Sequence, residues 1–153
     1  FQFLETLDLS FNRVPSSNLL TLEHLPWLWN LNLESNDLTT LPSTLSFLRC
    51  LDSLNLSNNN FTSDNLIVEP SSIMSAIFTI PRLWRLNLSR NKFWALHLEG
   101  VYIENCQFLQ ELDMSFNLIS SESDLMNALE LSNLWILIIS NNPFSVKGNT
   151  QNY

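Results

Sequence analysis

The stretch that decides the fold reads L-D-S-L-N-L-S-N-N-N-F and runs from Leu51 to Phe61. Leucine stands at its first, fourth and sixth positions, asparagine at its ninth and an apolar residue at its eleventh. Alternation of apolar and polar residues in the middle predicts a short strand with leucines on one side. Further copies of this spacing begin at Leu4, Leu28, Leu83, Leu109 and Leu134. The chain is therefore a tandem array of six copies of one unit.

The asparagine at the ninth position recurs in every copy. These residues are Asn12, Asn36, Asn59, Asn91, Asn117 and Asn142. Here the chain must turn away from the strand, which leaves backbone donors and acceptors without partners. An amide side chain donates and accepts at once, so stacked asparagines satisfy those groups. We predict that the six side chains form a buried ladder.

Together these positions make the pattern L-x-x-L-x-L-x-x-N-x-φ, with φ apolar, which is the signature of the leucine-rich repeat. The sequence resembles that superfamily over essentially its whole length. The resemblance implies an α/β solenoid, a horseshoe arc with a parallel β-sheet on its concave side and mixed helices and loops on its convex side. On this interpretation, residues 1–153 form a single domain of six repeats and are a fragment of a longer chain.

The segments between the copies predict the convex side. Residues 16–25 and 123–131 each open with a serine and have a helical pattern of apolar residues. The longest connection contains residues 71–80, which we predict as a helix that a proline ends. Residues 41–48 predict a short turn, and residues 97–106 receive no secure assignment.

Function is expected on the concave strand face, because curvature exposes a row of side chains there. The centre column of that face is Asp8, Asn32, Asn55, Asn87, Asp113 and Ile138. The next outward column adds Glu34 among small serines, and Arg85 stands in the column on the other side. This polar, mildly acidic face suits a partner that brings hydrogen-bond donors or positive charge. We predict that the polar residues of these columns bind a protein.

Three tryptophans hold matching positions, one residue after the first leucine of alternate copies: Trp29, Trp84 and Trp135. Tryptophan buries a large area and has a polar N–H group, so it is typical of interface anchors. Two interpretations stay open: the rings contact a partner, or they cover neighbouring side chains at the strand edge.

Composition argues against several other functions. The net charge is −8 and Lys plus Arg total only 7, whereas nucleic-acid binding needs clustered cations. No apolar run reaches the roughly 18 residues of a membrane helix. The two histidines stand in different copies, and no glycine-rich phosphate loop is visible. We predict no catalytic residue, metal, cofactor, nucleic acid or small-molecule substrate.

The two cysteines bear on the compartment. Cys50 and Cys106 each precede a copy in apolar surroundings, which predicts two buried, reduced thiols. Extracellular repeat arrays usually have cysteine-rich caps, and none is visible here. The sequence therefore favours a reducing, cytoplasmic compartment.

Irregular repeat lengths and the linker S-E-S-D-L-M-N-A-L-E-L resemble intracellular leucine-rich repeat families of ciliary and cytoskeletal assemblies. They resemble the X-ray radiation resistance-associated family more loosely. The resemblance implies a non-enzymatic protein–protein interaction scaffold within a larger intracellular assembly, in a cilium or the cytoskeleton. One alternative is an extracellular receptor ectodomain that recognises a protein ligand. Another is a regulatory domain attached to an enzyme elsewhere in the chain.

Overall fold

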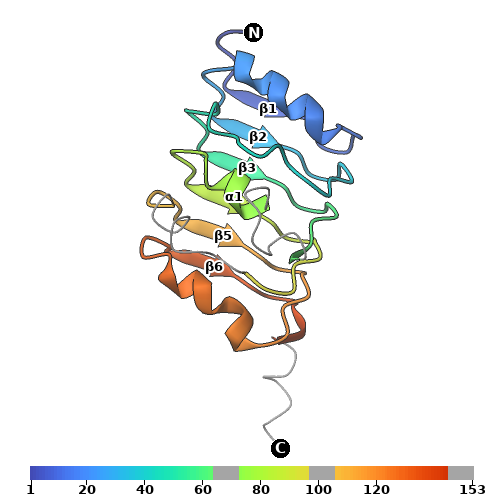
Figure 1. The fold of residues 1–153 in the computed structure, drawn as a ribbon, viewed down its shortest axis with the longest axis vertical. Coiled ribbons are helices and arrows are strands. Elements are labelled where there is room, and N and C mark those ends of the chain that lie inside the picture. The colour runs from blue at the N-terminus through green and yellow to red at the C-terminus, as the bar shows by residue number, and fades with distance from the viewer. Residues whose placement is uncertain (64–72, 97–105, 145–153) are drawn as a thin grey trace, which may run out of the picture.

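The computed structural model describes residues 1–63, 73–96 and 106–144. Within these ranges, six short strands form one parallel sheet whose order follows the sequence, as Figure 1 shows from the N-terminus to the C-terminus. The strands are β1 (Thr6–Asp8), β2 (Asn30–Asn32), β3 (Ser53–Asn55), β4 (Arg85–Asn87), β5 (Glu111–Asp113) and β6 (Ile136–Ile138). Each strand comes from one copy of the repeat, so the predicted parallel sheet is confirmed.

All strands pair in one register, so equivalent positions of the repeat lie side by side. Leu54, for example, is opposite Leu31 on one side and Leu86 on the other. Because neighbouring strands are about 4.8 Å apart, each position forms a column of side chains across the sheet. Any residue on the sheet can therefore be placed relative to its neighbours from its position in the repeat.

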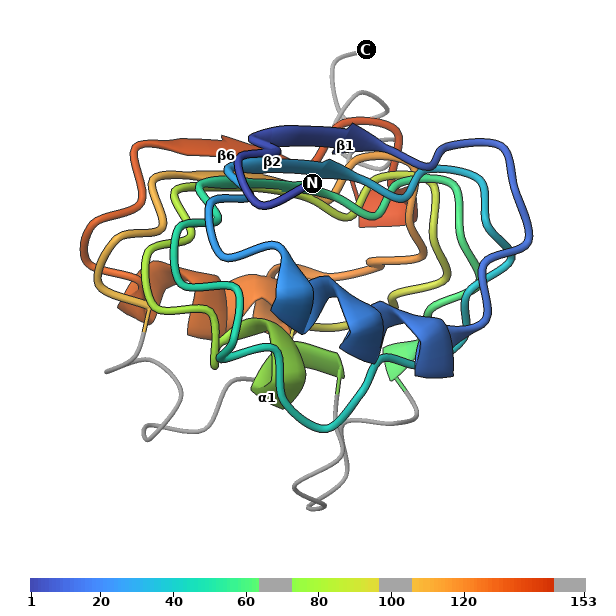
Figure 2. The same ribbon diagram turned by 90° about the horizontal axis from the view of Figure 1, so that it is seen from above.

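A second layer of helices and turns lies opposite the sheet (Figure 2). The buried leucines fill the space between the two layers. It contains η1 (Ser16–His24), α1 (Ile73–Ile77) and η3 (Glu122–Glu130). The helical segments predicted at 16–25 and 123–131 exist, but they are 3-10 helices. A 3-10 helix rises about 2.0 Å per residue against about 1.5 Å for an α-helix, so nine residues cross more of the coil.

The remaining predictions for this layer have different outcomes. The helix predicted at 71–80 is shorter, because α1 ends at Ile77 and the chain then turns towards Pro81. The turn predicted at 41–48 is confirmed, with the Leu48 N–H group donating to the Leu45 carbonyl at 3.0 Å. Residues 71–72 and 97–105 lie outside the described residues.

The core is continuous along the solenoid. Leucines at the fourth and sixth positions of the middle copies are almost completely buried, as are Phe61 and Phe93 at the eleventh position. In the first copy, Leu7 and Leu9 are only partly buried. The coils therefore share one apolar interior, as the leucine-rich repeat α/β solenoid predicts.

The start of η3 makes stability depend on pH. Asp124 Oδ2 accepts hydrogen bonds from the N–H groups of Ser121 at 2.9 Å and Ser120 at 3.2 Å. Burial by itself would raise the pKa of Asp124, but hydrogen bonds from these two serines outweigh it and lower the pKa. A lowered pKa means that the carboxylate stabilises the fold above its unfolded pKa of about 3.9. This contribution is lost as the pH falls through the folded pKa.

We expect Asp124→Ala to reduce the free energy of unfolding by about 0.5–1 kcal/mol near neutral pH, because the helix start loses its acceptor. Urea unfolding at a series of pH values should show the difference from wild type shrinking below pH of about 3.9. Glu122→Ala, in the same turn, is the matched control. A difference that is the same at every pH would contradict the assignment.

Candidate functional site

The asparagine ladder fixes the bend that follows each strand. Asn59 Oδ1 accepts hydrogen bonds from the N–H groups of Asn36 at 3.0 Å and Leu38 at 2.9 Å in the preceding coil. Asn59 Nδ2 donates to the carbonyls of Leu33 and Leu56, both at 3.0 Å, and so joins two successive coils. The other buried ladder residues that donate to the preceding coil are Asn36, Asn91, Asn117 and Asn142. The predicted ladder is confirmed for these five residues.

For Asn12 the prediction of a buried side chain is wrong. Asn12 is exposed, and its Nδ2 donates to the carbonyls of Leu9 and Ser10 within its own coil. It belongs to the first coil, and among the described residues no coil packs on the outer side of that coil. Burial of a ladder residue therefore depends on a preceding coil, which sequence spacing alone does not reveal.

The centre column of the strand face has a structural task that sequence reasoning missed. In each of five coils the side-chain oxygen accepts a hydrogen bond from the N–H group two residues later, at 2.8–3.1 Å. The residues are Asp8, Asn32, Asn55, Asn87 and Asp113. These bonds form Asx turns, and Asp or Asn at the end of each strand was the available signal. For Asp8, bonds from the Ser10 side chain and backbone lower the carboxyl pKa.

The residue before each ladder asparagine adopts a left-handed conformation, which the sequence did not predict. Their φ angles lie between 53° and 58°. The residues are Phe11, Ser35, Asn58, Arg90, Phe116 and Asn141. A bulky side chain is rarely found in this region, because its Cβ approaches the backbone. Phe11 and Phe116 are nevertheless exposed, and the Arg90 guanidinium lies 4.1 Å from the centroid of the Phe116 ring.

The tryptophan column lies beside the strands, where backbone pairing continues for one more residue. The backbone N–H group of Trp84 donates to the backbone carbonyl of Asp52, and that of Trp135 donates to the backbone carbonyl of Gln110, both at 2.9 Å. Trp29 is 52% exposed and Trp135 is 80% exposed, so most of each ring is accessible. That a partner contacts these rings stays a prediction.

The positive charge on this face is already engaged within the chain. Arg85 Nε donates to Glu111 Oε2 at 2.8 Å, and the Arg85 guanidinium lies over the Trp84 ring at 5.1 Å from its centroid. Trp84 is correspondingly less exposed than Trp29 and Trp135. The predicted binding residue Arg85 is therefore held in place by its neighbours. We call the outward side chains of β1–β6, together with the tryptophan column, the strand face.

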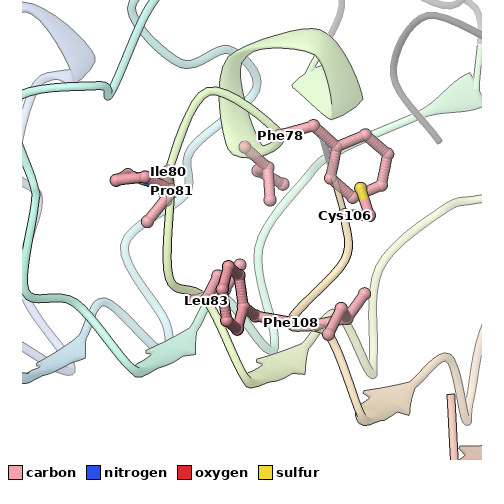
Figure 3. A pocket seen from close by; sticks show the side chains of 8 residues that line it. Phe78, Ile80, Pro81, Leu83, Cys106 and Phe108 are labelled. Atoms are coloured by element: carbon pink, nitrogen blue, oxygen red, sulfur yellow. The ribbon is translucent and has the colours of Figure 1, made fainter. Parts of the chain in front are cut away.

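The helical side of the solenoid contains a small cavity beside Cys106 (Figure 3). Its volume is about 10 Å³, with Phe78, Leu83 and Phe108 among its lining residues. A space of this size holds about one water molecule and no larger ligand. Cys106 is buried as predicted, and burial raises the pKa of its thiol. The prediction of a buried Cys50 is wrong, because this residue is only partly buried.

We expect a small alkylating reagent to modify Cys50 at least about tenfold faster than Cys106, because the reactive thiolate is scarce in a buried thiol with a raised pKa. Mass spectrometry of Cys50→Ser and Cys106→Ala variants measures each rate separately. In denaturant the two rates should converge. Equal rates in the native protein would contradict the burial of Cys106.

Residues 1–63, 73–96 and 106–144 contain no cluster of three His, Cys, Asp or Glu side chains placed to hold a metal ion. Among the helices of these same ranges, none has the length and apolar character that crossing a membrane requires.

Comparison with known proteins agrees with this geometry. The family model for the Leucine Rich Repeat matches residues 50–74, which include β3 and the ladder residue Asn59. The repeat pattern, this match and the fold identify the domain as a leucine-rich repeat solenoid. The leucine-rich repeat fold is generally a non-enzymatic scaffold for protein interaction, which indicates protein partners for this domain.

Solved structures share the fold of this leucine-rich repeat domain. A leucine-rich repeat protein of Leptospira interrogans superposes with a TM-score of 0.66 at 28% identity, covering 92% of this chain and 32% of that chain. A chain of the mouse RP105/MD-1 complex has a TM-score of 0.59 at 20% identity, covering 80% of this chain and 20% of that chain. The second likeness shows the fold alone.

Two curated relatives are described as probable serine/threonine-protein kinases of Dictyostelium discoideum. The domain is 35% identical to pats1 over 131 residues, which is 84% of this chain and 4% of the kinase. It is 48% identical to roco8 over 63 residues, which is 39% of this chain and 3% of that kinase. The domain thus spans only a small fraction of the length of these relatives.

Proposed function

We propose that this leucine-rich repeat domain is a protein–protein interaction scaffold whose strand face binds the partner. The observation that carries the proposal is the fixed geometry of that face. Side chains at equivalent positions lie in register across the sheet, and Asx turns hold the centre column. Because these side chains are already ordered, less conformational entropy is lost when a partner binds.

Accessible aromatic and aliphatic side chains supply the apolar part of such an interface. Trp135 and Ile136 are both exposed at the last strand of the sheet, and Trp29 is exposed beside the second. Exposed tryptophans surrounded by polar side chains are typical of interface anchors. This distribution favours a partner that extends across several strands.

The setting that we propose is a larger intracellular assembly, with a ciliary or cytoskeletal assembly as the first to be tested. The two thiols support a reducing compartment, where such cysteines persist. An extracellular receptor ectodomain is the alternative. Imaging of the tagged full-length protein separates the two, since a signal at the outer cell surface would overturn the intracellular setting.

A second candidate function is that the domain recognises a protein for an enzyme domain located elsewhere in the same polypeptide. The observation that favours it is the similarity to two probable kinases, of which the matched stretch is a small part. On this proposal the domain binds a partner or substrate protein, and a separate domain performs the chemistry. The full-length sequence tests it, because it would contain a catalytic domain.

Site-specific photocrosslinking tests the role of the strand face. A benzophenone amino acid is placed at Asn30 or Ser53 on the strand face, and at Ser17 or Met126 on the helical side as controls. After irradiation in extract of the source cells, we expect crosslinked protein from the two strand-face positions and only background from the controls. Crosslinks confined to Ser17 and Met126 would overturn the proposal.

A further inference from the structure

Trp29 is flanked by a carboxylate on each neighbouring coil. The backbone N–H group of Trp29 donates to the Glu5 backbone carbonyl at 2.7 Å, and the backbone N–H group of Asp52 donates to the Trp29 backbone carbonyl at 2.9 Å. These three residues therefore occupy one column of the sheet, with neighbours about 4.8 Å apart. Glu5 is exposed, Trp29 is 52% exposed and Asp52 is half-buried. An aromatic ring between two carboxylates is a suitable environment for a cation.

The same column already holds one guanidinium, at Trp84. The Arg85 guanidinium lies 5.1 Å from the Trp84 ring centroid, and Arg85 Nε is 2.8 Å from Glu111 Oε2 on the neighbouring strand. This arrangement combines a cation–π contact with a charge-assisted hydrogen bond. The chain itself therefore occupies the cation position at Trp84.

At Trp29 none of the described residues places a cation in the corresponding position. Register places Asn30 in the column of Arg85, and asparagine is short and neutral. Within residues 1–63, 73–96 and 106–144, Arg85 pairs with Glu111 and the His24 side chain lies 3.8 Å from Glu23, so neither Glu5 nor Asp52 has a basic partner.

The third tryptophan has different surroundings. Trp135 is followed by the exposed Ile136, and its neighbour in the column is the neutral Gln110. Of the three tryptophans, Trp29 alone combines a carboxylate on each neighbouring coil with a neutral residue in the arginine position.

We propose that Trp29, Glu5 and Asp52 bind an arginine side chain of the protein partner. This inference rests on the proposed function of the strand face and names the chemistry that the face recognises. The guanidinium lies over the Trp29 ring, as that of Arg85 lies over Trp84, and its N–H groups donate to the carboxylates. Charge complementarity agrees, since the chain has a net charge of −8.

The test uses a fluorescein-labelled peptide of glycine and serine with three arginines, and the same peptide with citrulline in their place. Citrulline has nearly the same shape but no charge. Fluorescence anisotropy at low ionic strength should show the arginine peptide binding at least about fivefold more tightly, and added salt should reduce this ratio. Equal binding of the two peptides would overturn the proposal.

Variants locate the site. Trp29→Leu should weaken arginine-peptide binding by about three- to fivefold. The Glu5→Gln/Asp52→Asn double variant should weaken it by about fivefold at low salt. The matched controls are Trp135→Leu and the Glu23→Gln/Glu130→Gln double variant, which makes the same change in net charge on the helical side. Equal weakening by the charge control would overturn a local site.

Arg85→Ser provides a gain-of-binding test. Removing the internal guanidinium leaves Trp84 and Glu111 accessible, so the variant should bind a second equivalent of the arginine peptide. Unchanged stoichiometry would contradict the analogy between the two tryptophan sites.

If the arginine peptide does not bind while Asn30 and Ser53 still crosslink a partner, the arginine site is wrong and the strand-face function stands. If the peptide does not bind and the two strand-face positions crosslink no partner, both the arginine site and the strand-face function are wrong.

Discussion

Asn59→Leu is expected to reduce the free energy of unfolding by about 4 kcal/mol, since at least two buried N–H groups lose their acceptor at roughly 1–3 kcal/mol each. Those groups belong to Asn36 and Leu38, which both donate to Asn59 Oδ1. Leucine has a similar volume but neither donates nor accepts. The cost therefore comes from unsatisfied backbone groups, and urea unfolding followed by circular dichroism measures it.

Asn12→Leu is the matched control, because Asn12 is the same residue type at the same position of the repeat but is exposed. Water can satisfy the groups that it leaves, so we expect a loss below about 1 kcal/mol. If the two variants were equally destabilised, the ladder would not be what holds successive coils together.

Phe93→Ala is expected to cost about 3–5 kcal/mol, the range found when a buried phenylalanine is truncated to alanine. The Phe93 side chain is 0% exposed and belongs to the continuous core between the sheet and the helical layer. Its removal leaves a cavity that packed coils on both sides prevent from closing. Thermal or urea unfolding should show the loss directly.

Phe3→Ala serves as the control for this truncation. The Phe3 side chain is 84% exposed, so its loss should change the free energy of unfolding by less than about 0.5 kcal/mol. A Phe93→Ala variant as stable as Phe3→Ala would mean that the eleventh position of the repeat does not face the core.

The strands, their parallel order and most of the ladder were predictable because each depends on the residue type at a fixed position of the repeat. Leu54 and Leu86 pair because both occupy the fourth position of a copy. The state of Asn12 was not predictable from position, because it depends on what packs outside the first coil. The serine-opened segments gave helices, but local sequence did not distinguish the 3-10 form from the α form.

The sequence predicted which residues lie on the candidate site, but not the hydrogen bonds and ion pair that they form. Sequence placed Asp8 and Asn55 on the outward face, yet their Asx-turn bonds depend on where each strand ends. The left-handed backbone conformation of Phe116 could not be predicted from the sequence, since phenylalanine rarely adopts it. The ion pair between Arg85 and Glu111 joins residues 26 apart and follows from strand register.

Hydrogen–deuterium exchange of single backbone amides tests the central claim, that buried asparagines join the coils and leave the strand face accessible. The N–H groups of Phe61, Phe93 and Ile119 donate to the side chains of the next ladder residues at 3.0–3.1 Å. We expect these amides to exchange as slowly as the strand amides, because both are released only when the coils separate. Exchange at the rate of an unprotected loop, with the strand amides still protected, would contradict it.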